Sequence, residues 1–225
     1  MVMFILNRWQ MIVIYGIMLL VVHVSTNGFR TNAPLCSVAP LISLVLMTFG
    51  TRMKLNKKIA TAGSFLVIAI GVYYWALLPK HLVSRALLFC SSSVLYLYTF
   101  VFHVRRIWKL LAVAVMAYCA GLVYYCVGDL FRSLPLLVVG VTADMITISI
   151  TLIAAGSLWK YGVHGSRLHE AKSAALLRFV GLLIELVCGS GILFNHFLSH
   201  HNFHQYMLLY YIAQFLLFLA NEQTF

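Results

Sequence analysis

Two carboxylic acids lie within long apolar stretches of this sequence, and they are its first candidates for chemistry. The chain has only five acidic residues. We expect Asp129 and Glu170 in connections and Glu222 in the C-terminal tail, which leaves Asp144 and Glu185 inside apolar segments. A carboxylate in hydrocarbon is costly, so such residues usually face a bundle interior and often mark function. The alternative is that both are protonated or hydrogen-bonded structural groups, and the sequence leaves the two interpretations equally open.

Each of these acids belongs to a stripe of residues on one face of a predicted helix. Small residues in such a stripe let neighbouring helices approach closely. The two helices are separate, so the sequence does not determine whether the acids meet. At helical spacing the two stripes are Gly140, Asp144, Thr147 and Thr151, and Glu185, Gly189, Ile192 and His196.

Histidines provide a second candidate site near the last connection. Their density there would suit zinc, but no other His or Cys cluster supplies further ligands at ordered spacing. The five cysteines contain no CxxC pair and are interpreted as small buried hydrophobic residues. A Gly-rich phosphate loop and a G-x-S-x-G elbow are both missing. We therefore expect no metal and no cofactor. The histidines concerned are His196, His200, His201 and His204.

The composition identifies the environment that must position these residues. The chain is 63% hydrophobic and 9% charged, whereas a soluble domain carries about 25% charged residues. Too little polar surface remains to cover a soluble fold, so lipid must be the solvent. The net charge of +11 attracts phosphate in general, but no recognition module surrounds the basic residues. We therefore expect membrane lipid as the partner and no nucleic acid.

The hydropathy pattern predicts an all-α, polytopic helix bundle. A helix needs about 20 apolar residues to cross the hydrocarbon core, and the sequence offers eight such segments. No soluble domain fits between them, so residues 1–225 form a single integral-membrane domain of undetermined oligomeric state. The predicted spans are 9–25, 35–50, 59–78, 82–103, 107–128, 134–157, 173–195 and 205–221.

The basic residues predict the orientation of these spans. Twelve of the 16 Lys and Arg residues fall at the N-terminus or in alternate connections on one side, and four fall on the other. The positive-inside rule then places both termini in the cytoplasm. The first segment has a rival interpretation as a cleaved signal peptide, but its basic n-region is weak and it lacks an A-x-A-like site. An uncleaved first helix is preferred.

Several segments resemble the YhhN-type lysoplasmalogenase family. The run Tyr210-Tyr211-Ile212-Ala213-Gln214 resembles the Tyr-Tyr-x-Ala-Gln signature that closes the family. The stretch 181–197 resembles its seventh helix, which opens with Gly and ends in Asn-x-Phe. Residues 82–100 and 139–141 resemble parts of its fourth and sixth helices. The resemblance covers about two thirds of the chain and implies a site lined by Asn195, Tyr210, Tyr211 and Gln214.

The family is taken to hydrolyse the vinyl ether bond of lysoplasmalogens, which yields an aldehyde and a glycerophospho-alcohol. In the reaction that this implies, an acid protonates the enol ether carbon and a carboxylate stabilises the oxocarbenium-like cation while water adds. This sequence departs from the family at that equipment. The family's third-helix Gly-Asp falls near Gly71-Val72, and its seventh-helix Ser-Asp falls on Cys188-Gly189. Neither aspartate is present.

Two explanations compete for this departure. The protein has either kept a lipid-binding fold and lost hydrolysis, which the double loss favours, or moved its acids to Asp144 and Glu185. The function predicted from the resemblance is that of a lysoplasmalogenase-like protein of the endoplasmic reticulum or another internal membrane. The rivals are a non-enzymatic lipid-binding regulator, a transporter with Asp144 as an ion site, and a His-metal membrane hydrolase. The absence of a convincing internal repeat weighs against the transporter.

Overall fold

Helices account for every regular element that the structure describes. The computed structural model describes residues 7–30, 33–77, 82–162, 168–197 and 204–223. Within these ranges there is no strand, which confirms the predicted all-α class, and each predicted span coincides with one α-helix. The α-helices are α1 (Arg8–Ser25), α2 (Pro34–Phe49), α3 (Leu55–Leu77), α4 (Leu82–Tyr98), α5 (Lys109–Val127), α6 (Pro135–Tyr161), α7 (Leu168–Phe197) and α8 (His204–Gln223). Two short 3-10 helices, η1 (Val101–His103) and η2 (Gly128–Phe131), precede α5 and α6.

Five of these helical regions are long and apolar enough to cross a membrane. They cover Arg8–Ser25, Leu55–Tyr74, Lys109–Phe131, Pro135–Tyr161 and Ala171–Phe194. The helices α2 and α4 are apolar but shorter. By length and composition the chain is therefore a membrane protein.

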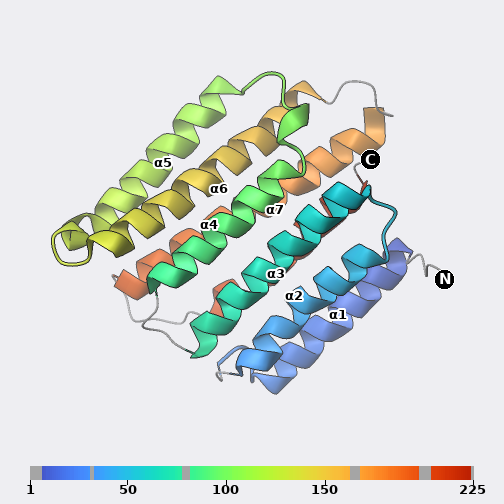
Figure 1. Cartoon of the computed structure of the whole chain (residues 1–225), viewed down its shortest axis with the longest axis horizontal. Helices are drawn as coiled ribbons and strands as arrows, with labels where there is room; N and C mark the ends of the chain where they lie inside the picture. The colour runs from blue at the N-terminus through green and yellow to red at the C-terminus, as the bar shows by residue number, and fades with distance from the viewer. Residues whose placement is uncertain (1–6, 31–32, 78–81, 163–167, 198–203, 224–225) are drawn as a thin grey trace.

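The helices form two layers, as Figure 1 shows. In the first layer α1, α2, α3, α4, α6 and α5 lie side by side in that order. In the second layer the α7–α8 hairpin packs behind them, with α7 against α6 and α8 against α2. Because α5 follows α4 in the chain but lies outside α6 in the layer, α4 and α6 are brought into direct contact.

The last helix, α8, is tied to each of the first four helices by a hydrogen bond. Tyr15 in α1 donates to the carbonyl of Tyr211 at 2.8 Å, and the Tyr211 hydroxyl donates to the carbonyl of Ser37 in α2 at 2.6 Å. Asn221 donates to Thr61 in α3 at 3.0 Å. In α4, the Tyr96 hydroxyl donates to a carbonyl of α8 at 3.1 Å. These partners explain how a helix with several polar side chains can lie at the centre.

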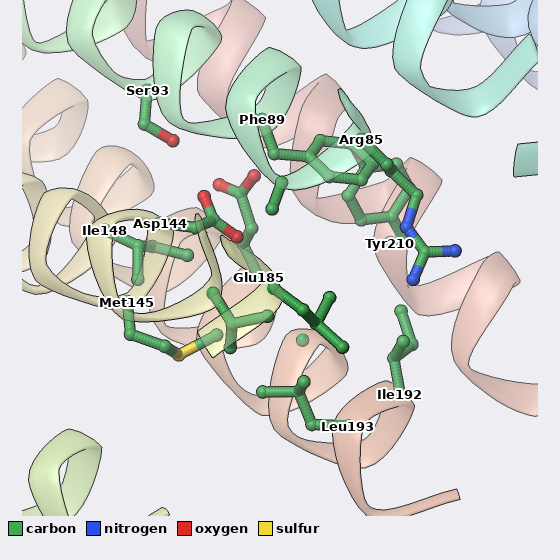
Figure 2. A pocket seen from close by; sticks show the side chains of 14 residues that line it. Arg85, Phe89, Ser93, Asp144, Met145, Ile148, Glu185, Ile192, Leu193 and Tyr210 are labelled. Atoms are coloured by element: carbon green, nitrogen blue, oxygen red, sulfur yellow. The ribbon is translucent and has the colours of Figure 1, made fainter. Parts of the chain in front are cut away.

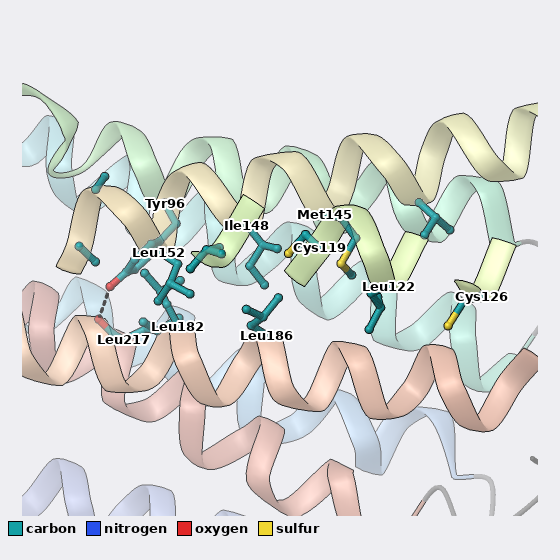
Figure 3. Close-up of a cluster of buried hydrophobic side chains, with 14 of the residues drawn as sticks. Tyr96, Cys119, Leu122, Cys126, Met145, Ile148, Leu152, Leu182, Leu186 and Leu217 are labelled. Atoms are coloured by element: carbon teal, nitrogen blue, oxygen red, sulfur yellow. Dashed lines mark hydrogen bonds between the residues drawn. The ribbon is translucent and has the colours of Figure 1, made fainter. Parts of the chain in front are cut away.

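Two hydrophobic clusters fill the space between the layers. One lies between α4, α5, α6 and α7, and Figure 3 shows Ile148, Leu152, Leu182 and Leu186 meeting within it. The other joins α1, α2, α3 and α8 around Phe65. The acids of interest lie near the border of the first cluster, on α6 and α7.

The two ends of the described chain lie at the same end of the bundle (Figure 1). Arg8 at the start of α1 forms an ion pair with Glu222 in the last turn of α8, with 3.1 Å between Nε and Oε2. Because α8 extends to Gln223, Glu222 belongs to this helix and not to a tail. Glu170 likewise lies in the first turn of α7, because both helices extend beyond their apolar portions.

Two basic residues that the sequence placed in connections are also buried in helices. Lys58 lies in the first turn of α3 and donates to the carbonyls of Phe49 and Thr51, at 3.2 and 2.8 Å, at the end of α2. Arg178 lies ten residues inside α7 and is 2% exposed. Both side chains donate to acceptors outside their own helix, Lys58 to backbone carbonyls and Arg178 to Oδ1 of Asn221 in α8.

Candidate functional site

A cavity of about 100 Å³ lies between α4, α6, α7 and α8, and both candidate acids line it (Figure 2). It is located in the half of the bundle away from the chain ends, where α4 and α6 begin and α7 ends. Most of its wall is apolar. The lining residues are Arg85, Ala86, Phe89, Ser93, Leu137, Val141, Asp144, Met145, Ile148, Glu185, Gly189, Ile192, Leu193 and Tyr210.

Asp144 and Glu185 come from different helices, and the structure brings them together. Asp144 is on α6 and Glu185 on α7, and both side chains are half-buried. Figure 2 shows the two carboxyl groups beside each other at one side of the cavity. The carboxyl groups of Asp144 and Glu185 are close enough for their charges to repel each other. Their relative position depends on how α6 and α7 are rotated, which the sequence left undetermined.

A cation faces the same cavity. Arg85, in the first turn of α4, lies within electrostatic range of Asp144, and Figure 2 places its guanidinium near Tyr210. Arg85 is one of the four basic residues on the less basic side and was not predicted as a site residue. Its position inside the predicted span 82–103 was the available signal, because a charge inside a span usually faces a partner or a cavity.

The helix that resembles the family signature supports the acid pair from α8. Gln214 is fully buried, and its Nε2 donates to Oε1 of Glu185 at 3.1 Å. Tyr210 lines the cavity, and its buried hydroxyl has no partner among the described residues; the same is true of Gln214 Oε1. A buried hydroxyl without a partner is uncommon. At this position it is available to a molecule in the cavity.

The other two residues implied by the resemblance lie differently. Tyr211 points towards α2, where its hydroxyl bonds to the carbonyl of Ser37, and it does not line the cavity. Asn195 belongs to α7, but its side chain lies outside the described part of the structure. Within the signature, Tyr210 therefore lines the cavity and Gln214 positions Glu185. Tyr211 instead joins α8 to α2.

The positions where the family carries its aspartates are apolar or empty here. Val72 is buried in the cluster around Phe65. Gly189 lines the cavity one turn after Glu185 on α7. The stripe that joined Glu185, Gly189 and Ile192 in the sequence therefore faces a single cavity, and it carries its acid one turn before Gly189.

The predicted histidine cluster lies beyond what the structure describes. His200 and His201 are outside the described residues, as are the side chains of His196 and His204. Among the residues that are described, no three His, Cys, Asp or Glu side chains are grouped to hold a metal ion. All five cysteines are free, and Cys119, Cys126 and Cys188 are buried as small hydrophobic residues.

The arrangement provides the groups for acid–base chemistry in an apolar environment. Two neighbouring carboxyl groups can hold one proton between them, so that one acts as an acid while the other is an anion. The adjacent cation can attract an anionic part of a ligand, and the apolar walls can hold a hydrocarbon chain. No family model, no curated protein and no solved structure matches this chain.

Proposed function

We propose that this protein is an integral membrane hydrolase that cleaves the vinyl ether bond of lysoplasmalogens, with Asp144 and Glu185 as its acid pair. The observation that carries the proposal is the position of these two residues. They are the acids that the sequence placed within spans, and they face one another in a largely apolar cavity. Their proximity favours relocated acids over lost activity, which reverses the preference drawn from the missing family aspartates.

In the proposed reaction, Glu185 donates its proton to the enol ether carbon that does not carry the oxygen. An oxocarbenium-like cation forms at the neighbouring carbon, and the Asp144 carboxylate stabilises it. Water adds to that carbon and gives its proton to a carboxylate. The resulting hemiacetal collapses to a fatty aldehyde and a glycerophospho-alcohol, so one water molecule is consumed and the acid pair regains its proton.

The assignment of roles follows from the neighbours of each acid. Arg85 lies within electrostatic range of Asp144, and a nearby cation stabilises a carboxylate. The Gln214 amide also donates to Glu185, but a neutral donor stabilises a carboxylate less than a cation does. We therefore assign the negative charge to Asp144 and the proton to Glu185. Arg85 would also attract the phosphate of the substrate, which the glycerol backbone separates from the vinyl ether by only a few bonds. Tyr210 would donate its hydroxyl to an oxygen of the bound lipid.

The proposal includes eight transmembrane helices with both termini in the cytoplasm of an internal membrane, such as the endoplasmic reticulum. Two features support this topology. The Arg8–Glu222 ion pair joins the first and last helices at one end of the bundle, as an even number of crossings requires. Most of the basic residues belong to that end by sequence, and the positive-inside rule assigns it to the cytoplasm.

The decisive experiment is aldehyde release from a defined lysoplasmalogen by the purified protein in detergent. We expect turnover by the wild type and a loss of at least about 100-fold in Asp144→Asn and in Glu185→Gln, the usual contribution of a general acid or base. Asp129→Asn is the matched control, because that acid is exposed on η2 outside the cavity. An analogue with a saturated ether should release no aldehyde.

A second candidate is a lipid-binding protein without hydrolytic activity. The specific observation in its favour is that Val72 and Gly189 provide no acid at the positions that the resemblance makes catalytic. Lysoplasmalogen bound stoichiometrically by wild-type protein, with no aldehyde released while a known lysoplasmalogenase is active in the same assay, would establish this candidate and overturn hydrolysis.

A further inference from the structure

A groove of about 960 Å³ lies between α5 and α6. It extends from η2 to the middle of both helices, where Met116 and Ser149 line it. Because α5 is the outermost helix of its layer (Figure 1), the groove opens sideways, and Met116 and Ile146 in its wall are 45% and 44% exposed. In a membrane protein this opening faces hydrocarbon, so a lipid can enter the groove without leaving the bilayer.

The wall of the groove near the middle of the two helices is largely apolar. Ser149 is buried there, and its hydroxyl donates to the carbonyl of Met145 at 2.6 Å and lies 3.0 Å from Sγ of Cys119. Both contacts lie within the protein, so this hydroxyl does not require a polar ligand. Asp129 lines the other end of the groove, on η2, and is exposed. The middle part of the groove therefore suits a hydrocarbon chain.

Met145 lines both this groove and the cavity that holds the acid pair. Its buried side chain reaches α7, where its methyl carbon is 3.8 Å from the place that a β-carbon on Gly189 would take. Figure 2 shows Met145 beside the acid cavity, and Figure 3 shows it beside Cys119, which lines the groove. A methionine side chain is flexible and fills irregular spaces. At this point one flexible side chain therefore separates the groove from the acid cavity.

The acid cavity is too small to hold a whole single-chain lipid. Its volume is about 100 Å³, whereas sites for small molecules generally measure about 300–1,000 Å³. The proposed substrate brings its vinyl ether to Asp144 and Glu185, and its hydrocarbon chain continues directly from the double bond. That chain needs a second space next to the acids, and the groove beyond Met145 supplies one.

We propose that the α5–α6 groove binds the alkenyl chain of the lipid whose vinyl ether lies in the acid cavity. Met145 moves aside to let the chain pass, and the chain continues along α5 past Ala120 towards Met116. The headgroup lies in the opposite direction, towards Arg85 in the first turn of α4. The end of the groove that carries Asp129 lies away from the chain. This inference rests on the proposed hydrolysis and adds to it the site that selects the lipid by its chain.

The first test compares aldehyde release from two lysoplasmalogens, one with a hexadecenyl chain and one with a butenyl chain. Ala120→Phe places a ring in the groove. We expect kcat/KM to fall about tenfold or more for the hexadecenyl lipid and to change little for the butenyl lipid. The matched control is Ala114→Phe, the same substitution at an exposed position of α5 that does not line the groove.

The two lipids and the two variants separate blocking of the groove from general damage. Equal losses for both lipids in Ala120→Phe would overturn the proposal, as would equal losses for the hexadecenyl lipid in the two variants. Thermal unfolding of each variant confirms that it is folded.

The second test is a crosslink that does not depend on turnover. A saturated ether analogue of the lysolipid, with a photoreactive diazirine in the middle of its chain, is added to the full-length protein in nanodiscs of phosphatidylcholine. After irradiation, labelled residues are identified by mass spectrometry. We expect label near Met116, Ala120 and Ile146, and its loss when unlabelled lysoplasmalogen is in excess. Label on other helices, or label that the competitor does not remove, would overturn the proposal and leave the groove to bulk membrane lipid.

The two tests also separate this inference from the proposed hydrolysis. Wild-type protein that releases no aldehyde would overturn the hydrolysis, and the crosslink would then decide whether the groove binds the chain. Active wild-type protein without the crosslink in the groove would overturn only the chain site.

Discussion

Two cavities of this protein lie towards opposite ends of one helix bundle and carry opposite kinds of charge. The cavity between α4, α6, α7 and α8 holds two acids and one arginine within mainly apolar walls. The cavity at the other end is lined by three cations and a histidine, which are Lys54, Lys57, Arg178 and His103, beside exposed aromatic rings. The first therefore places two acids and a cation in apolar surroundings, and the second groups basic side chains at the end of the bundle that carries the chain ends.

The difference teaches how one helix bundle can keep a pair of acids apart from a group of cations. The acids lie well inside the helices α6 and α7, where neighbouring side chains exclude water and each charge has a strong effect. Lys54 and Lys57 lie just before and in the first turn of α3, next to a connection. The long helix α7 belongs to both cavities, because it carries Glu185 in one and Arg178 in the other.

The largest effect that would sharpen this comparison concerns the acid pair as a unit. We expect the double variant Asp144→Asn/Glu185→Gln to release aldehyde no more slowly than the worse of the two single variants, because groups that act together are strongly non-additive. Each single variant is expected to be about 100-fold or more below the wild type. Single-turnover rates from the four proteins provide the measurement. If the loss of rate in the double variant equals the product of the losses in the two single variants, the acids do not share one reaction step.

A second large effect should be a loss of stability when Arg178, which lines the cavity at the other end, is replaced. Arg178→Met keeps the bulk of the side chain but removes the donors to Asn221 and Tyr96, at a cost of about 3 kcal/mol for charged, buried hydrogen bonds. For a chain of this size the melting temperature should fall by about 5–10 °C. The variant Lys172→Met, an exposed lysine on the same helix, should melt like the wild type. Equal melting of the two variants would show that the arginine is not part of the framework.

The smallest effect distinguishes adjacent tyrosines that the sequence treated alike. Tyr210→Phe removes a hydroxyl that faces the acid cavity and has no partner among the described residues. It should slow turnover by about tenfold and leave the melting temperature unchanged. Tyr211→Phe removes the hydrogen bond to Ser37, so it should cost about 1 kcal/mol of stability with turnover unchanged. The reverse pattern would contradict the assignment of Tyr210 to the cavity.

The sequence was a good guide to the helices because long apolar runs separated by short polar connections leave little alternative to helical structure. All eight predicted spans coincide with helices, including α2 and α4, which are short. The sequence was a poor guide to which faces meet. Apolar residues surround much of α6, so a small rotation costs little in hydrophobic burial, and the proximity of Asp144 and Glu185 could not be deduced. The contacts of α6 with α4, α5 and α7 determine that rotation.

Arg178 shows a second limit of sequence reasoning. The positive-inside pattern counts basic residues without regard to depth, and it grouped this arginine with the charges of the connection before α7. The structure buries it beside Phe100 and Asn221. The available signal was its position inside the predicted span 173–195. An arginine there needs partners, and the amide of Asn221 in the last helix was an unassigned candidate.

The central position of α8 has a consequence for the biosynthesis of the protein. Tyr15, Tyr96 and Thr61 all find their hydrogen-bond partners on this helix, which follows the other seven along the chain. A ribosome delivers the N-terminal helices first, so those polar groups enter the membrane before their partners exist. Assembly of the bundle must therefore wait for α8. Nascent chains that stop before this helix should be recognised by quality control as unassembled, even though seven of their eight helices are present.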